Sequence, residues 1–169
     1  MKRLLIAFYG WFYRALGRRV ALRGEITLVH RKDGRIVEIR KIHNVVHNPG
    51  LASLAGLVNG VVTTPFTRLA IGTGTTPVDP NHTALASEIT TGGGARRVAT
   101  VGRETTVVPN DTATWVATWN FTASFAVTES GIFDAPTGGV MLARSVFAPI
   151  NVEAGSALTL TWKVQFARP

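Results

Sequence analysis

Apolar and polar side chains alternate strictly along two segments in the second half of the chain. One apolar set consists of Ala113, Trp115, Ala117, Trp119 and Phe121, and the other of Leu158, Leu160, Trp162, Val164 and Phe166. Successive side chains of a strand point to opposite faces, so each segment predicts a β-strand with one buried face and one wetter face. We expect the tryptophans of these segments in the core, because large aromatic side chains are mostly buried.

Further runs rich in Val, Thr and Phe occupy residues 67–73, 96–108, 124–134 and 140–147. Clusters of Gly, Pro, Asn and Asp lie between the runs at 92–94, 109–111, 136–139 and 153–155. Short strands separated by turns at this spacing are typical of all-β folds. The body, residues 25–169, is therefore predicted to be mainly β, an antiparallel β-sandwich or a jelly-roll-like barrel, with its main strands between residues 67 and 168.

The first part of the body predicts a hairpin followed by one short helix. The hairpin is expected within residues 25–46, where two β-rich runs flank Asp33-Gly34, a strong signal for a tight turn. The helix is expected over 49–59, since Pro49 favours a helix start and Gly60 a helix end. Its apolar residues share one face, namely Leu51, Leu54, Ala55 and Val58.

Residues 1–24 predict a basic amphipathic helical arm. Their apolar residues recur at steps of three and four, which places them on one face of a helix. Gly10 and Gly17 each weaken such a helix by about 1 kcal/mol relative to alanine, so the helix needs a partner that covers its aromatic face. The residues expected to bind that partner are Leu4, Leu5, Phe8, Trp11, Phe12, Arg14, Leu16, Arg18 and Arg19.

Three interpretations of the arm stay open. A signal peptide would have the charged start and the apolar run seen here, but no small-residue cleavage site follows. The apolar run is shorter than the roughly 20 residues that span a bilayer, whereas a basic helix with Trp and Phe suits a membrane surface. The third interpretation is a helix that docks into the groove of a partner protein.

The net charge of +8 lies entirely in the first 50 residues. They contain eleven basic and three acidic residues, whereas residues 51–169 contain seven of each. A basic arm on a neutral body indicates an anionic partner for the arm, and the alternative is a solvated basic face. The chain has no cysteine, which excludes a disulfide framework and thiolate metal sites.

The segment IGTGTTPVDPNHTALASEIT, residues 71–90, has glycines like those of a phosphate-binding loop but lacks the other features. A P-loop ends in Lys-Ser or Lys-Thr, and no lysine occurs between residues 42 and 162. A dinucleotide fingerprint would need a third glycine and a βαβ unit. We therefore predict that 72–88 is a long connection with a role in assembly. Its candidate assembly residues are Thr73, Thr75, Pro77, Asp79 and His82.

The residue patterns predict no catalysis, cofactor or bound metal. His43 and His47 are four apart, but the two valines between them favour an extended chain, so surface or hairpin-end histidines are the simpler interpretation. Glu129 and Asp134 form a carboxylate pair of the kind used in acid–base catalysis, but no nucleophile or metal-ligand pattern accompanies them. We expect no catalytic, cofactor-binding or metal-binding residue and no small-molecule substrate.

Several short stretches of the body occur in a characteristic order. They are NPGL at 48–51, IGTG at 71–74, TESGIF at 128–133, MLAR at 141–144 and LTLTW at 158–162. With these stretches, residues 45–166 resemble a family of small structural proteins of tailed bacteriophages, often described as tail-fibre, tail-collar or virion structural proteins. The arm lies outside the resemblance.

This resemblance implies a non-enzymatic virion component that forms a homotrimer or another homo-oligomer, on the capsid exterior or on the tail. Its partners would be the major capsid protein or the neck and tail proteins. We expect a capsid decoration (cement) protein held by its arm, and the alternative is a neck, tail or fibre-base protein. A membrane-surface protein, a nucleic-acid binder using the basic hairpin and a glycan hydrolase are weaker hypotheses. For nucleic acid, the aromatic residues cluster in the arm rather than among the strand arginines.

Overall fold

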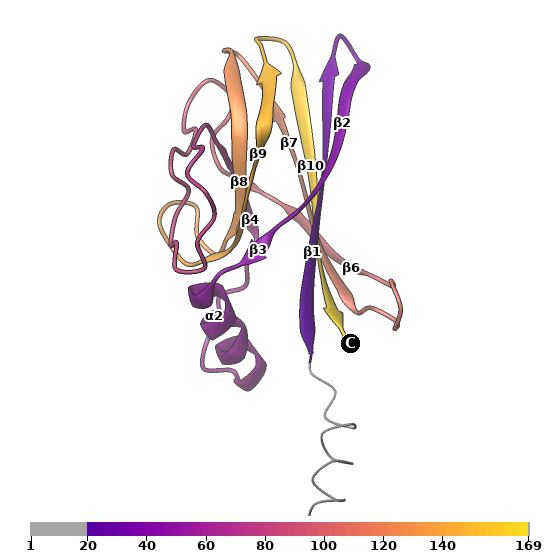
Figure 1. Ribbon diagram of the computed structural model, residues 1–169, viewed down its shortest axis with the longest axis vertical. Helices are drawn as coiled ribbons and strands as arrows, with labels where there is room; N and C mark the ends of the chain where they lie inside the picture. The colour runs from indigo at the N-terminus through magenta and orange to yellow at the C-terminus, as the bar shows by residue number, and fades with distance from the viewer. Residues whose placement is uncertain (1–19, 169) are drawn as a thin grey trace, which may run out of the picture.

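The computed structural model describes residues 20–168, which form two antiparallel sheets packed face to face (Figure 1). Sheet A has the order β2 (Arg35–His43), β1 (Ala21–Lys32), β10 (Ala157–Ala167), β7 (Thr112–Asn120) and β6 (Thr100–Glu104). Sheet B has the order β3 (Val45–Val46), β9 (Met141–Val152), β8 (Phe125–Phe133), β4 (Arg68–Gly72) and β5 (Arg97–Val98). The predicted mainly-β sandwich is confirmed. Residues 1–19, including every residue expected to bind the partner of the arm, lie outside the described residues.

The core lies between the sheets and is built from the alternating strands that the sequence indicates. Trp119 and Trp162 are fully buried, and Trp115 is buried opposite Trp162 in the register of β7 and β10. Phe166 departs from the predicted pattern, because its side chain is 45% exposed. It lies one residue from the end of β10, beyond Val164, where the main core of the sandwich ends.

The β1–β2 hairpin turns at the predicted place. Asp33 and Gly34 both have positive φ angles, 50° and 74°. A two-residue turn with positive φ at both positions is type I′, whose twist matches that of the two strands it joins. The sequence pair Asp-Gly favours this conformation because both residues tolerate the left-handed region. The turn therefore sets the register beside it, and a bulge at Val37 shifts the register by one residue in the rest of the hairpin.

The boundary predicted between arm and body is wrong by four residues, because β1 begins at Ala21 and not at residue 25. Ala21 is paired with Ala167 at the end of β10. Leu22 and Gly24 continue the alternation of β1 on its core side, so the strand extends into the segment assigned to the arm. Residues 21–24 are therefore part of the sandwich and not of the arm.

Helix α2 (Asn48–Asn59) confirms the predicted helix. The face of the helix that packs against the body is not the predicted one. Gly60 ends it in the left-handed conformation with φ 77°, as expected of a helix C-cap. Gly50 and Ser53 are buried, whereas Leu51 and Val58 are exposed. Gly50 lies against the backbone of Leu142, and this close approach turns the helix so that the apolar face proposed from the sequence is largely left outside.

Residues 105–108 form a loop, although the sequence pattern predicts that they continue a strand. The carboxylate of Asp111 accepts hydrogen bonds from the amides of residues 106–108 at distances of 2.9 to 3.1 Å. These amides are donors that a strand would offer to its neighbour. Because Asp111 takes them, β6 ends at Glu104 and the chain turns toward β7.

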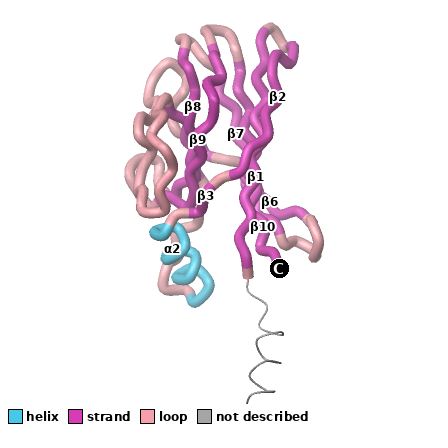
Figure 2. The backbone as a smooth tube through the Cα atoms, viewed as in Figure 1, coloured by secondary structure: helices cyan, strands magenta, loops and turns pink. Residues whose placement is uncertain are grey.

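Sheet B is covered on both faces. β8 is buried continuously from Val127 to Phe133. Leu85, from the connection that follows β4, packs on Ala70, Phe133 and Met141 in a second small core. Figure 2 shows the connection as loop lying beside β8, on the side away from sheet A. The stretch TESGIF therefore does not alternate between apolar and polar positions, because both faces of this strand are packed.

Candidate functional site

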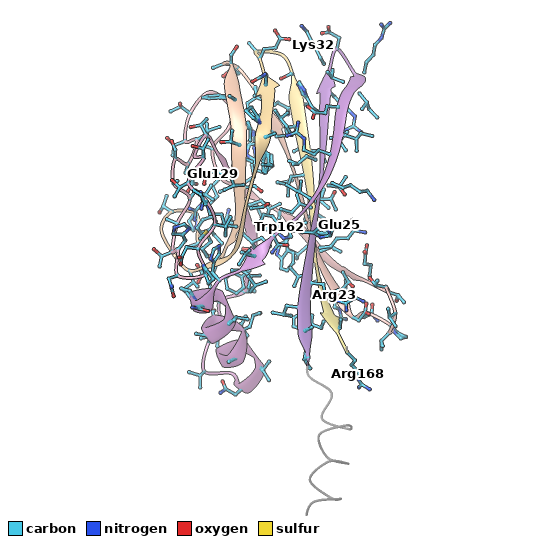
Figure 3. All side chains as sticks on the ribbon, viewed as in Figure 1. Arg23, Glu25, Lys32, Glu129, Trp162 and Arg168 are labelled. Carbon is cyan, nitrogen blue, oxygen red and sulfur yellow. The ribbon has the colours of Figure 1, made fainter. Side chains whose placement is uncertain are left out.

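The connection over residues 73–88, called the anchored loop below, is held on sheet B by one carboxylate. Glu129 lies on β8 and is fully buried (Figure 3). Its Oε1 accepts hydrogen bonds from the amides of Gly74 at 3.0 Å and Ser87 at 2.7 Å, and its Oε2 accepts one from the amide of Ala86 at 3.0 Å. One side chain therefore binds both ends of the loop.

Arg144 on β9 neutralises this carboxylate and reaches further into the loop. It is also fully buried, its Nε donates to Glu129 Oε2 at 2.8 Å, and its Nη2 lies 2.7 Å from the same oxygen in an ion pair. The same Nη2 donates to the carbonyl of Thr76 at 3.0 Å, and Nη1 lies 3.1 Å from His82 Nδ1. A buried ion pair is stable only when further hydrogen bonds satisfy its remaining groups, and the backbone of the loop supplies them.

The middle of the anchored loop is a tight turn organised by Asp79 and His82. The amide of Asn81 donates to Asp79 Oδ1 at 2.8 Å, and the amide of Asp79 donates to His82 Nδ1 at 3.2 Å. The hydrogen bond from the Asn81 amide is the main reason why the pKa of Asp79 is lowered. His82 Nδ1 accepts from Asp79 and faces Arg144, so these partners assign the ring proton to Nε2.

The structure brings the predicted assembly residues onto one ordered loop. Thr73, Thr75, Pro77 and Asp79 are exposed, and His82 is half-buried against Arg144. A shallow depression of about 300 Å³ opens beside them. It is lined by Thr76, Asn81, His82, Thr83, Ala84, Leu85, Ala86 and Arg144. The loop therefore presents threonine and proline side chains outward from a backbone that is fixed from below.

His47 is a buried residue and not a surface histidine as the sequence suggested. It precedes α2 with 0% exposure, and neither ring nitrogen has a hydrogen-bond partner. Its ring lies 6.2 Å from that of His82, centroid to centroid. Burial lowers its pKa and outweighs the carbonyls of Pro80 and Asp79, which favour the protonated ring.

His43 does not join His47 in a metal site. It ends β2 in an exposed position, and its Nδ1 lies 3.3 Å from the carbonyl oxygen of Gly24. The short strand β3 separates it from His47, so the helical spacing that would place both rings on one face is missing. Within residues 20–168 no group of three histidine or acidic side chains is arranged to hold a metal ion.

The two carboxylates considered for acid–base chemistry, Glu129 and Asp134, accept hydrogen bonds from backbone amides instead. Glu129 is sealed beneath the loop by three amides and one guanidinium. Asp134, at the end of β8, accepts a hydrogen bond from the amide of Val140 at 2.7 Å and so closes the β8–β9 connection. A general acid or base must reach the proton of a substrate, and the Glu129 carboxylate has 0% exposure.

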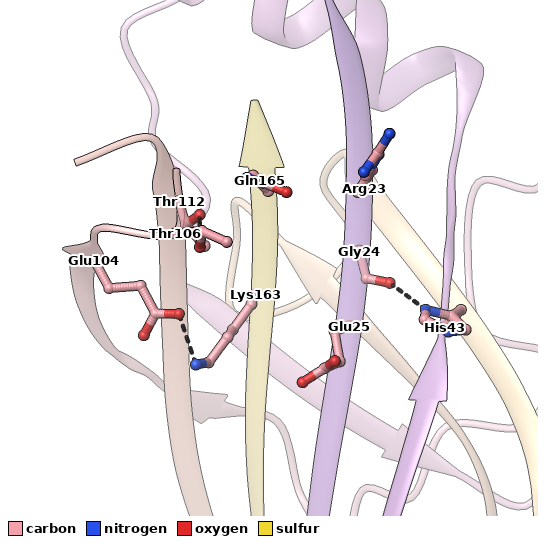
Figure 4. A pocket seen from close by; sticks show the side chains of 9 residues that line it. All are labelled: Arg23, Gly24, Glu25, His43, Glu104, Thr106, Thr112, Lys163 and Gln165. Atoms are coloured by element: carbon pink, nitrogen blue, oxygen red, sulfur yellow. Dashed lines mark hydrogen bonds and ion pairs between the residues drawn. The ribbon is translucent and has the colours of Figure 1, made fainter. Parts of the chain in front are cut away.

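A second depression, of about 300 Å³, lies at one end of sheet A (Figure 4). Lys163 and Glu104 pair across it at 2.6 Å, and Glu25 lies beside them. The complete lining is Arg23, Gly24, Glu25, His43, Glu104, Thr106, Thr112, Lys163 and Gln165. Its positive and negative side chains largely offset one another, and the depression contains no arrangement of nucleophile, base and orienting group.

The sequence did not lead us to Arg144 as a site residue, or to the role of Glu129 in binding the backbone of the anchored loop. The signal was present, because each is a single charged residue inside a stretch that otherwise predicts a buried strand. A charge in such a position is stable only beside an opposite charge. Pairing the two charges would have indicated that β8 and β9 are neighbours.

Comparison with protein-family models and with curated protein sequences gave no match for this chain. In the part of the chain that the structure describes, no helix has the length and apolar character needed to cross a bilayer.

Proposed function

We propose that the protein is a non-enzymatic structural component of a tailed-phage virion, and within the virion a capsid decoration protein attached through its basic N-terminal arm. One observation carries the proposal. The buried charges beneath the anchored loop bind one another and the loop backbone, so the loop offers neighbouring subunits a fixed surface. The resemblance of residues 45–166 to phage structural proteins supports the virion as the setting.

The position of the chain ends supports attachment through the arm. β1 starts and β10 ends at the same end of the sandwich, and the β1–β2 turn lies at the opposite end (Figure 1). The arm sequence is therefore connected at one end of an elongated body. A lattice that binds the arm would leave the other end, including the Asp33-Gly34 turn, pointing away from it. This arrangement suits a protein that binds an outer surface in many copies.

A neck, tail or fibre-base protein is the second candidate. The resemblance of residues 45–166 is to proteins often described as tail-fibre or tail-collar proteins, and this supports the second candidate. A homo-oligomer built from the same body would serve in a ring as well as on a lattice. The two candidates differ in the number of copies per particle.

The copy number in purified virions tests the proposal. Quantitative mass spectrometry would measure this protein relative to the major capsid protein. Hundreds of copies per particle are expected for a decoration protein, and a small multiple of three, six or twelve would assign it to the neck or tail. Absence from virions would overturn the structural role and favour the membrane-surface interpretation of the arm.

A further inference from the structure

Strand β2 is a long unpaired edge of sheet A. It has nine residues, whereas the edge strands β6, β3 and β5 have five, two and two. Very short edges are a common protection against pairing with another chain, and β2 lacks that protection. Its side chains Ile36, Val37 and Ile39 are 55%, 59% and 58% exposed. The edge therefore offers both unpaired backbone groups and apolar side chains.

The neighbouring edge in sheet B is closed to pairing. The half of β9 that extends past β3 contains Pro149, which has no amide hydrogen to donate. Arg40 of β2 donates to the carbonyl oxygens of Ala148 and Pro149 and so occupies the acceptors of this edge. On this side of the sandwich, β2 is therefore the edge that can accept another strand.

We propose that β2 pairs antiparallel with β2 of a second copy of this chain, about a two-fold axis at Ile39. The inference deepens the homo-oligomer of the proposed function and rests on it. A two-fold axis perpendicular to a continuous sheet leaves each side chain on the same face of the sheet. Opposed residues of the two copies must therefore share a face, which requires that one residue lies directly opposite its own counterpart in the second copy. Each residue of β2 is therefore a candidate for this self-opposed position, called the centre below.

Charge complementarity selects Ile39 among these centres. Glu38 and Arg40 form an ion pair within each chain. In the register centred on Ile39 the two pairs lie side by side with Glu38 opposite Arg40 of the second copy, so no like charges face each other, and Ile39 lies opposite Ile39. Val37 is the extra residue of a bulge, because His30 pairs with Glu38 and Arg31 with Ile36, so regular pairing of the two copies is centred on residues 38–40. Opposite charges and β-branched pairs across strands stabilise a sheet.

The other central registers are less favourable. A centre at Glu38 would place two glutamates opposite each other, and centres at Arg40 or Lys41 would place two cations opposite each other. A centre at Val37 would place Glu38 opposite Ile36 and leave the end of the strand unpaired. Pairing at Ile39 joins the two A sheets into one continuous sheet of ten strands.

A single cysteine tests the register in the full-length protein, which has no native cysteine. Directly opposed residues of antiparallel strands have Cα atoms about 4.5 to 5.5 Å apart, within the range that a disulfide spans. Under mild oxidation we expect Ile39→Cys to form a covalent dimer. The matched control is Val101→Cys on the β6 edge, which is 53% exposed and should remain mostly monomeric. No dimer from Ile39→Cys, or equal amounts from both variants, would overturn the proposal.

Sedimentation velocity of the full chain provides a second measurement without cross-linking. Ile39→Lys removes the central apolar pair and sets two lysines opposite each other, so we expect the dissociation constant of the dimer to rise at least about tenfold. Circular dichroism would show that the variant stays folded, because Ile39 is exposed. An unchanged dissociation constant in the folded variant would contradict the pairing.

The copy-number measurement separates this inference from the proposed function. A protein that is present in virions but forms no dimer through Ile39→Cys would keep the virion role and lose the β2 interface. A protein that dimerises through Ile39→Cys but is missing from virions would keep the interface and lose the virion role.

Discussion

Single buried charges determine where the anchored loop lies. Glu129 binds the amides of Gly74, Ala86 and Ser87, and Arg144 both neutralises Glu129 and binds the loop. Isolated charges cannot be buried without a large loss of solvation energy, so each of these two residues makes the other possible. The position of an exposed surface is in this way set by atoms that solvent does not reach.

Glu129→Gln should destabilise the fold strongly. The substitution leaves the Arg144 guanidinium buried without an opposite charge, and loss of one partner of a buried pair typically costs about 3–5 kcal/mol. Urea denaturation followed by tryptophan fluorescence measures this free energy of unfolding. The control is Glu153→Gln, which removes a half-exposed pair with Lys32 and should leave the free energy within measurement error. Equal effects of the two substitutions would contradict the role given to Glu129.

His47 should make the protein sensitive to acid. Burial lowers its pKa below the ordinary value of about 6.5, so the unfolded chain takes up a proton at a higher pH than the folded chain does. The stability that the neutral ring provides is complete above pH 6.5 and is lost as the pH falls below it. Arg144 and His82 lie near the ring and oppose its charge, while Asp79 favours it.

His47→Phe should reduce this sensitivity, because phenylalanine fills the same space without binding a proton. The free energy of unfolding at pH 7.5 and at pH 5.5 would be compared for both proteins. We expect the wild type to lose more stability between these values than the variant loses. His43→Gln, at an exposed position, is the control and should behave as the wild type. A wild type and a His47→Phe variant with equal losses would show that His47 does not titrate in this range.

At the scale of elements, the sequence predicted those features that depend on local chemistry. The type I′ turn at Asp33-Gly34, the end of α2 at Gly60 and the alternation of β7 were all readable from neighbouring residues. The loop at residues 105–108 was not predicted. Its residues favour a strand, but the carboxylate of Asp111 holds them in a loop. One residue that binds the amides of its neighbours can override their strand propensity.

Asp111→Ala should loosen this loop without unfolding the sandwich. Partial burial opposes the charged form of Asp111, but hydrogen bonds from Val108, Thr106, Gln165 and Val107 outweigh it and hold its pKa well below the usual range. We expect the amides of residues 106–108 to exchange with deuterium at least about tenfold faster in the variant. Asp33→Asn is the control, since asparagine also suits its turn. Unchanged exchange in Asp111→Ala would mean that other contacts hold the loop.

At the scale of the whole molecule, the chain divides into a body with a complete core and a net charge of +3, and a more strongly basic segment before it with a net charge of +5. The described residues 20–168 bury three tryptophans between two sheets. The fold class follows from the period-two pattern, but the pairing of β3 with β9 and the burial of both faces of β8 depend on contacts between distant segments. No local pattern carries that information. The single charges Glu129 and Arg144 inside apolar stretches were a signal for the site beneath the anchored loop, but they had to be paired across the chain to indicate it.

Removal of residues 1–19 should separate folding from attachment. Since residues 20–168 contain the core of the sandwich, the truncated chain is expected to keep its melting temperature within about 2 °C. Its binding to virions that lack the protein should be lost, because we propose that the arm supplies the aromatic and basic residues of attachment. Trp11→Ala/Phe12→Ala in the full chain should weaken binding in the same direction. Full binding by the truncated chain would exclude the arm as the attachment.

The anchored loop becomes ordered only after most of the chain has been made. Glu129 lies 55 residues after Gly74, whose amide it holds, and Arg144 lies 68 residues after Thr76. During synthesis the exposed surface therefore does not exist until β8 and β9 have left the ribosome and paired. A chain released early, or caught half folded, lacks the face that would meet its neighbours. Under the proposed function, assembly would be restricted to finished subunits, with the buried ion pair as a check on completeness.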